Sequence, residues 1–410
     1  MSPTLQFLII LIIILVAAKS SGMLAARLGQ PAVLGELIAG VLLGPTAIDL
    51  FGADFVTDPH LEETVLLLAE LGVVFLMFLA GLETDVGEVN KVRRVAFLAG
   101  TFGVMFPIVL GTATVLPFDF SFKDALFIGV ILSATSVSIS ARTLMELGVL
   151  QRRQGIAILA AAVIDDVLVI LVLSFFVAFG VEEGGASNAG EVFLIVGRVL
   201  LFFVVALVVG RFVLPWVARW SMNTPMSEGV AVTAIVVMLL FAWFAEYVGE
   251  VALITGAFLA GVFLRTTDVH RVIDEKFRTL AYAFFVPIFF VGVGLSADAG
   301  GLEGSDVLLL VVICAVAVVS KVLGSGLGAY LGGEGLRSSL QIGTGMVSRG
   351  EVGLIVASVG LTHGLIDTDQ FSVVVLMVLV TTLITPPLLN LVFAGEGEAR
   401  NVQHSRPDPA

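Results

Sequence analysis

The sequence of 410 residues has few of the charged residues that a soluble domain carries. Charged residues make up only 13% of the chain, whereas soluble globular domains contain about 25%. The single cysteine, Cys314, excludes a disulfide framework and a thiolate metal cluster. Lys and Arg number 21 against 34 Asp and Glu, and the resulting net charge of −13 would repel a nucleic acid. These shortages exclude a disulfide-stabilised domain and a nucleic-acid-binding protein.

Long apolar runs dominate the chain instead. Hydrophobic residues make up 58% of it, and runs of about 20 residues, long enough to cross about 30 Å of hydrocarbon, recur almost throughout. The first run, Leu5 to Ala18, has no basic residue before it and is followed by Lys19 and Arg27, so we expect a retained anchor rather than a signal peptide. The sequence therefore predicts an all-α polytopic membrane protein with no room for a soluble domain.

Charged, Pro-rich and Gly-rich segments divide the chain into thirteen candidate transmembrane helices. They lie at 4–28, 31–48, 63–82, 92–116, 123–147, 154–180, 191–214, 227–246, 250–266, 278–296, 305–332, 338–362 and 371–393. Lys and Arg collect in cytoplasmic loops. With the N-terminus outside, seventeen of the 21 basic residues lie on the inner side, and only Lys123 lies in an outer loop. We therefore predict that the N-terminus is outside and the C-terminus is cytoplasmic.

Two short strings recur in the second half of the chain. Ala39–Leu43 (AGVLL) is echoed by Ala260–Leu264 (AGVFL), and Phe78–Asp85 (FLAGLETD) by Val291–Asp298 (VGVGLSAD), at offsets of 221 and 213 residues. These offsets match a unit of six helices, with the seventh helix turning the second unit upside down in the membrane. A chance match of apolar strings is the alternative. Two inverted six-helix repeats would place a substrate site near the midplane, between broken helices.

Ionisable side chains lie deep inside several predicted spans, where each costs several kcal/mol and is a functional hypothesis by default. At about 1.5 Å per residue, Asp165 and Lys321 lie roughly 16 Å from the inner ends of their spans. Thr135–Ser138 and Ser348–Glu351 reach a similar depth. All four groups are therefore expected near the middle of the bilayer.

Two spans contain polar, helix-weakening stretches at this depth, Ser133–Ser138 (SATSVS) and Gly343–Gly350 (GTGMVSRG). We predict that both are unwound crossings, because free carbonyls and half-helix ends supply oxygen ligands and partial charges to an ion. The alternative is that Ser, Thr and Gly only permit close helix packing. Two matched breaks at the depth of a double carboxylate favour a functional role, with Thr135 and Ser136 as candidate ligands.

Asp165 and Asp166 are neighbours, so on a helix their side chains project about 100° apart and one can pair while the other stays exchangeable. Lys321 is the only lysine at this depth, and an opposite charge lowers the cost of a buried carboxylate. We therefore predict an ion pair between Asp165 and Lys321, which holds two helices together, takes part in coupling, or both. Asp166 is then the better exchangeable site, unless it is a hydrogen-bonded structural carboxylate.

Such a set of residues suits a site that exchanges a cation for protons. Hard cations such as Na⁺ prefer oxygen ligands, and burial disfavours an uncompensated carboxylate charge, so the same oxygens can hold either a proton or a cation. Arg349 and Glu351 are expected to neutralise each other or the half-helix ends. No catalytic residue and no cofactor are expected. The candidate ion- and proton-binding residues are Asp165, Asp166, Thr135 and Ser136, with the metal ion on the two aspartates and with Lys321, Arg349 and Glu351 as charge partners.

Over nearly its full length the chain resembles the bacterial and archaeal Na⁺/H⁺ antiporters of the cation:proton antiporter-2 family. The matching strings are QPAVLGE at 30–36 with Gly40 and Gly44-Pro45, LMFLAGLE at 76–83, ATSVS at 134–138 and VIDDV at 163–167. In that family the Asp-Asp form accompanies electrogenic exchange, and Lys321 stands where electrogenic members carry the pairing lysine. The resemblance implies that Asp166 alternates between Na⁺ and a proton, that bound Na⁺ releases Asp165 from Lys321, and that two protons move per Na⁺.

The resemblance also implies a homodimer in which a core bundle slides against a panel as an elevator. The panel would comprise 1–90 and 227–303, the core 91–180 and 304–394, the linker helix 181–226 and the cytoplasmic tail 395–410. Such a protein would lie in the cell membrane and exchange cytoplasmic Na⁺ or Li⁺ for external H⁺ in pH homeostasis. The potassium-efflux branch matches less well, because its members usually carry a Gln-Asp pair and a cytosolic nucleotide-binding domain.

Three other functions compete with this one. K⁺/H⁺ exchange stays open, because the ligand distances that separate Na⁺ from K⁺ are not encoded in a readable motif. A cation channel would need rings of filter carbonyls from several subunits rather than a buried ion pair. An intramembrane aspartyl protease would need two aspartates from different helices facing one water, whereas Asp165 and Asp166 are adjacent.

Overall fold

The computed structural model describes residues 1–45, 47–84, 86–118, 120–180, 189–223, 228–295, 304–362 and 364–394. All regular secondary structure within these ranges is helical. The elements are α1 (Pro3–Arg27), α2 (Ala32–Leu43), η1 (Leu50–Gly52), α3 (Leu61–Glu83), α4 (Val86–Val115), η2 (Leu116–Phe118), α5 (Phe122–Ser133), α6 (Val137–Glu146), α7 (Arg153–Gly180), α8 (Ala189–Val208), η3 (Val209–Val213), α9 (Leu214–Asn223), α10 (Gly229–Tyr247), α11 (Leu253–Arg265), α12 (His270–Leu280), η4 (Ala281–Phe285), α13 (Val286–Leu295), α14 (Gly304–Leu331), α15 (Leu336–Gly345), α16 (Glu351–Thr362) and α17 (Thr368–Val392).

Ten helical stretches of the described chain are long and apolar enough to cross a membrane, and α2 and α11 are shorter apolar helices. Each of the thirteen predicted ranges contains helix, while the count of thirteen spans and the inverted repeat stay predictions. One boundary is clearly wrong, because a helix already begins at His270, before the predicted start at 278. The charged residues there form an amphipathic helix, in which Arg278 donates to Asp274 one turn earlier at 2.9 Å.

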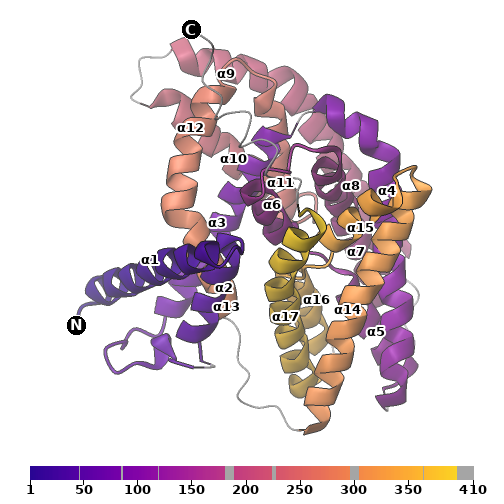
Figure 1. Ribbon diagram of the computed structural model, residues 1–410. Helices are drawn as coiled ribbons and strands as arrows, with labels where there is room; N and C mark the ends of the chain where they lie inside the picture. Colours follow the sequence, from indigo (N-terminus) through magenta and orange to yellow (C-terminus); the bar gives the residue numbers. More distant parts are fainter. Residues whose placement is uncertain are drawn as a thin grey trace.

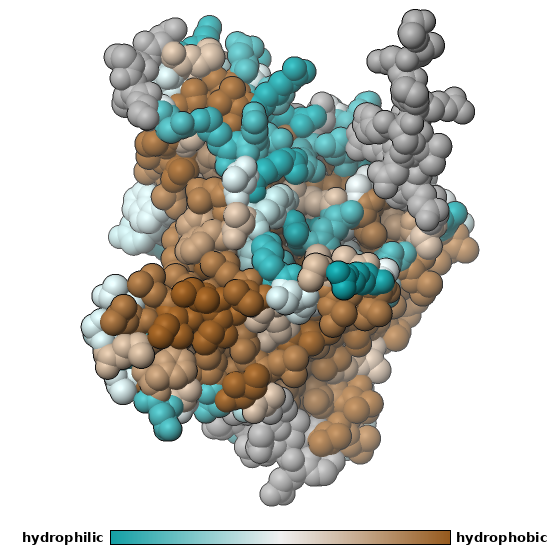
Figure 2. Space-filling model, turned by 60° about the vertical axis from the view of Figure 1, so that its left-hand side comes forward, coloured by the Kyte–Doolittle hydropathy of each residue, from teal (hydrophilic) through white to brown (hydrophobic). Residues whose placement is uncertain are grey.

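The molecular surface is the inverse of a soluble protein's. Large apolar side chains are widely exposed on α1 and α8, where Ile12 is 61% and Leu207 60% exposed. Figure 2 shows hydrophobic side chains gathered over the lower part of one face and hydrophilic ones above them. Soluble proteins rarely expose apolar patches larger than a few hundred Å². The chain is therefore a multi-span membrane protein.

The helices pack as two groups (Figure 1). The first helix group consists of α1, α2, α3 and α10–α13, in which α3 packs against α11 and α13, and α2 against α1 and α13. The second helix group consists of α4–α7 and α14–α17, and is built around α4, which contacts α5, α7 and α14. The helices α8 and α9, joined by the π-helical turn η3, connect the groups along the chain, with α8 against α7 and α9 against α10.

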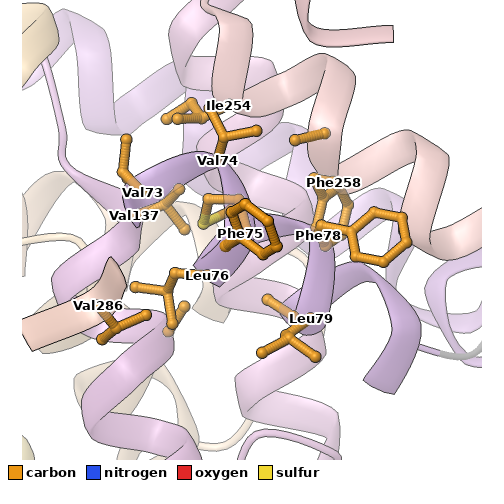
Figure 3. Close-up of a cluster of buried hydrophobic side chains, with 14 of the residues drawn as sticks. Val73, Val74, Phe75, Leu76, Phe78, Leu79, Val137, Ile254, Phe258 and Val286 are labelled. Carbon is orange, nitrogen blue, oxygen red and sulfur yellow. The ribbon is translucent and has the colours of Figure 1, made fainter. Parts of the chain in front are cut away.

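The hydrophobic interior of the first helix group is rich in phenylalanine (Figure 3). Phe75 stacks on Phe285 with ring centres 4.6 Å apart, and Phe78 lies 4.7 Å from Phe277. Val137, at the start of α6 in the second helix group, is buried in the same cluster. The two groups therefore share an apolar contact as well as the polar contacts described below.

Helices α3 and α11 cross at close range through two glycines. Gly81 lies against the backbone of Phe258, and Gly261 lies against the backbone of Phe78. A Cβ atom at either glycine would collide with a carbonyl oxygen of the other helix. Small residues of this kind let helix backbones approach closely in membranes.

We expect Gly261→Val to destabilise the protein by about 3 kcal/mol, because added methyl groups in a close-packed site force backbone shifts. Gly197 on α8 is the matched control, since nothing lies within 4 Å of a Cβ built there. Thermal unfolding in one detergent measures both variants. Equal melting temperatures for Gly261→Val and Gly197→Val would contradict the close crossing.

Candidate functional site

Both stretches predicted as unwound crossings are broken in the structure. Helix α5 ends at Ser133 and α6 begins at Val137. Helix α15 ends at Gly345 and α16 begins at Glu351. Hydroxyl side chains compete with helical backbone hydrogen bonds and glycine weakens helices, which is why these segments unwind.

The two breaks hydrogen-bond to each other. The backbone N–H of Ser136 donates to the carbonyl of Ser348 at 2.9 Å, and the Ser348 hydroxyl donates to the carbonyl of Ser136 at 2.5 Å. The Ser140 hydroxyl donates to the carbonyl of Gly345 at 2.6 Å. Gly350 packs on the Ser136 side chain so closely that a Cβ would lie 2.6 Å from it. The contacts satisfy backbone groups that unwinding would otherwise leave unpaired inside a bilayer.

The ion pair predicted between Asp165 and Lys321 is present. Lys321 Nζ on α14 donates to Asp165 Oδ1 on α7 at 2.6 Å, and both side chains are fully buried. Gly103 on α4 lies beside the pair, where a Cβ would collide with the Ser325 hydroxyl at 2.4 Å and would be in ordinary van der Waals contact with both bonded atoms at 3.6 Å. Removing either charge would leave the other buried and uncompensated, which is strongly destabilising.

Arg349 lies at the end of a half-helix, where one of the two predictions places it. Its buried guanidinium donates to the carbonyls of Val347 at 2.5 Å and Met346 at 3.3 Å, where α15 ends, and to Ala317 on α14 at 2.9 Å. A helix C-terminus carries partial negative charge. The side chain of Glu351 lies outside the described residues, and its pairing with Arg349 stays a prediction.

Two carboxylates and two basic groups therefore interact in one buried cluster. Besides the direct ion pair, Arg349 interacts electrostatically with Asp165, and Lys321 with Asp166. The formal charges of the four side chains cancel when both aspartates are ionised. A cation or a proton that binds to an aspartate then gives the cluster one excess positive charge. This excess favours the release of a proton or a cation that is already bound there.

Asp166 contacts a residue that the sequence did not single out. Its side chain is 2% exposed, and the Thr255 hydroxyl donates to its Oδ2 at 3.4 Å. Thr255 lies on α11 in the first helix group, whereas Asp166 lies on α7 in the second. The available signal was that Thr255 is the one hydroxyl-bearing residue of α11 (LITGAFLAGVFLR).

Two buried oxygens near the breaks are unused within the described part of the chain. Thr135 Oγ1 and Asp165 Oδ2 have no hydrogen-bond partner there, while the Ser136 hydroxyl lies 2.9 Å from that of Ser138. No group of three His, Cys, Asp or Glu side chains among the described residues is placed to hold a metal ion. A cation on these aspartates would therefore need hydroxyl, carbonyl or water oxygens as further ligands, which hard cations accept.

A cavity of about 340 Å³ between the two helix groups reaches the break. It is lined by Gly350 and by Ile254, the residue before Thr255. Glu70 on α3 and Glu246 on α10 also line it. We call it the intergroup cavity. Its lining therefore brings two carboxylates and a residue of the second break to one cavity.

The two helix groups also make polar contacts at the C-terminal end of α6, away from the intergroup cavity. Glu146 Oε2, at the end of α6, accepts from the backbone N–H of Ala32 on α2 at 2.6 Å. Arg142 lies 4.3 Å above the ring of Tyr282 in η4 and pairs with Glu146 at 2.8 Å. Glu36 on α2 is buried beside this cluster, at 2% exposure. These contacts join the two helix groups at the end of α6.

The chain matches known proteins along most of its length. The family model described as sodium/hydrogen exchanger, transmembrane, matches residues 9–394. The probable Na⁺/H⁺ antiporter GerT of Bacillus cereus is 38% identical over 93% of this chain and 98% of that protein. The Na⁺/H⁺-K⁺ antiporter GerN of the same organism is 37% identical over 96% and 98%.

A solved structure supports the fold. The sodium proton antiporter MjNhaP1 from Methanocaldococcus jannaschii at pH 8 superimposes with a TM-score of 0.66 at 15% sequence identity, covering 97% of this chain and 99% of that one. At this identity the match supports the helical architecture alone.

Proposed function

This chain belongs to the sodium/hydrogen exchanger family, and from that premise we propose that it exchanges Na⁺ for H⁺ at Asp165 and Asp166. The family consists of membrane transporters rather than enzymes. The observation that carries the proposed site is the fully buried Asp165–Lys321 pair beside Asp166, in a helical bundle that contains two broken, crossing helices.

In this proposal Asp166 holds a proton in one phase of the cycle and Na⁺ in the other. The Thr135 hydroxyl, Ser136 and the free carbonyls of the breaks complete the oxygen ligands. Na⁺ draws Asp165 away from Lys321, since the carboxylate is shared between two positive charges. The exchange is electrogenic, with two protons per Na⁺, as in the Asp-Asp type of the cation:proton antiporter-2 branch.

Access to the site alternates by an elevator motion in this proposal. The first helix group is the panel, the second is the moving core, and α8 with α9 forms the linker. The thirteen spans form two inverted six-helix repeats, and the N-terminus is outside. The intergroup cavity then opens to the outside, because it is lined by the first half of α3, and the contacts of Arg142 and Glu146 close the cytoplasmic side.

The physiological setting follows from the same proposal. A homodimer in the cell membrane expels cytoplasmic Na⁺ or Li⁺ in exchange for external H⁺ and contributes to pH homeostasis. Arg349 supports the site by neutralising the end of α15. The polar tail after the last helix is cytoplasmic.

K⁺/H⁺ exchange is a second candidate. One relative that is 37% identical is named as a Na⁺/H⁺-K⁺ antiporter. The ligand set of carboxylate, hydroxyl and carbonyl oxygens also accepts K⁺, because selection between these ions depends on cavity size and ligand number.

Ion-gradient dequenching in proteoliposomes tests both candidates. With the membrane potential clamped, we expect Na⁺ and Li⁺ to dissipate a pH gradient saturably, and K⁺ to do so at least about ten-fold less well, a difference of about 1.4 kcal/mol. Equal responses to Na⁺ and K⁺ would favour the second candidate. Flux that does not saturate and is independent of the pH gradient would indicate a channel.

A further inference from the structure

We propose that Thr255 is a side-specific ligand of the transport site, a hydroxyl that the first helix group supplies to Asp166 while the site faces the intergroup cavity. The inference rests on the proposed role of Asp166 as the ion-binding carboxylate. It assigns to α11 a direct role in binding the transported cation. The residues of the two breaks and of the ion pair all belong to the second helix group, whereas α11 belongs to the first.

The position of Thr255 suits such a role. Its side chain is 2% exposed, and its hydroxyl donates to Asp166 Oδ2 at 3.4 Å. The three preceding residues, Ala252, Leu253 and Ile254, all line the intergroup cavity. The backbone N–H of Thr255 bonds to the carbonyl of Ala252 at 2.9 Å, which fixes the first turn of α11 at the cavity wall. The hydroxyl therefore contacts the carboxylate from the residue that directly follows this cavity-lining stretch.

The contact crosses the boundary between the two helix groups. Gly256, next to Thr255, packs against the backbone of Phe241 on α10, and Gly261 packs against Phe78 on α3. These close crossings fix α11 in the first helix group, while Asp166 belongs to the second. At 3.4 Å the contact is already near the limit of a hydrogen bond. A slide of one group by even a few ångströms would break it.

The Thr255 hydroxyl can contact Asp166 whether the carboxylate is ionised, protonated or bound to a cation. A threonine hydroxyl has one hydrogen to donate and two lone pairs to accept. It donates to an ionised carboxylate, accepts from a protonated one, and offers an oxygen to a cation held there. When the second helix group moves away, this oxygen stays behind on α11. The site then has one ligand fewer, so Na⁺ should bind more tightly on the cavity side than on the opposite side.

Thr255→Val tests this asymmetry, because it replaces the hydroxyl with a methyl group at nearly constant volume. In proteoliposomes of defined orientation, we expect the half-saturating Na⁺ concentration on the cavity side to rise about ten-fold, the effect of losing a contact to a charged group. On the opposite side it should change less than about two-fold. Thr255→Ser keeps the hydroxyl and should restore most of the cavity-side affinity.

Thr267→Val provides the matched control. Thr267 is also buried and follows α11, and its hydroxyl bonds only locally, to the carbonyl of Leu264 at 2.6 Å. We expect no side-dependent change from it. If Thr255→Val does not fold, Thr255→Ala and Thr255→Ser give the same comparison, and Na⁺-induced stabilisation against heat reports binding without transport.

An equal change on both sides, or no change on either, would overturn the inference and leave Thr255 a packing residue. Asp166→Asn, measured in parallel, separates this outcome from failure of the proposed function. If Asp166→Asn still exchanges Na⁺ for H⁺, the proposed site is wrong regardless of Thr255. If Asp166→Asn abolishes exchange and Thr255→Val changes the half-saturating Na⁺ concentration equally on both sides, only the proposed role of Thr255 is wrong.

Discussion

Asp166→Asn is expected to lower Na⁺/H⁺ exchange by at least about 100-fold, the cost of removing a positioned proton carrier, while leaving a folded protein. The amide has nearly the same shape as the carboxylate, and its oxygen can still accept the Thr255 hydroxyl that lies 3.4 Å away. It takes up no proton in the working range of pH, and it offers a cation no negative charge. Packing is therefore preserved and the exchangeable charge is lost.

The measurement is Na⁺-driven alkalinisation or acidification of proteoliposomes, with melting temperature and size-exclusion profile as checks of folding. Asp54→Asn is the control, because Asp54 is exposed before α3 and the change removes the same charge. We expect wild-type exchange from this variant. Retained pH-driven Na⁺ flux in Asp166→Asn would show that ion and proton do not share this carboxylate.

The sequence predicted the central part of the candidate site because its signals are chemical and local. Lysine and aspartate deep inside apolar runs must find each other, since an unpaired charge there is costly. The Asp165–Lys321 contact at 2.6 Å satisfies that requirement. The breaks were predictable for a similar reason, because serine and glycine at the midplane compete with helical hydrogen bonding.

The contacts that depend on how helices are arranged could not be predicted. Thr255 and Asp166 are 89 positions apart, and a lone threonine in an apolar helix gives no indication of its partner. Sequence alone also left Arg349 with two alternatives, Glu351 or a half-helix end. The hydrogen bonds of the guanidinium to the carbonyls of Met346 and Val347 depend on how the break is shaped in space, which the local sequence does not specify.

The predicted helix boundary at 278 is wrong because a polar segment forms a helix rather than a loop. The segment HRVIDEKFRTL is charged enough to suggest a cytoplasmic loop, yet it forms α12, with Ile273 and Phe277 buried on one face. A period of 3.6 residues in a mostly polar segment is the signal that indicates this helix. Helix α2 is shorter than the predicted range 31–48, because it ends at Leu43, before Gly44 and Pro45. Here the apolar run continues beyond the end of the helix.

Lys321→Gln is expected to destabilise the protein by about 3 kcal/mol, the cost of breaking a buried ion pair by removing one partner. Both partners are fully buried, and the described residues place one further basic group, Arg349, in electrostatic contact with Asp165. The same variant should change the charge moved per cycle. If Na⁺ displaces Lys321 from Asp165, the lysine helps to set how many protons accompany each Na⁺, and its loss shifts the reversal potential.

Two comparisons separate the structural and coupling roles of Lys321. Asp165→Asn/Lys321→Gln removes both charges and should recover most of the lost stability, because a neutral buried pair needs no compensation. The exposed pair of Lys91 and Glu88 at the start of α4 provides the control, since Lys91→Gln should cost less than about 1 kcal/mol. If the double variant is stable yet its reversal potential differs from wild type, the pair serves coupling beyond stability. An unchanged melting temperature together with an unchanged reversal potential in Lys321→Gln would refute both roles. Burying a lysine costs desolvation energy, and this result would leave that cost without a gain in stability or in coupling.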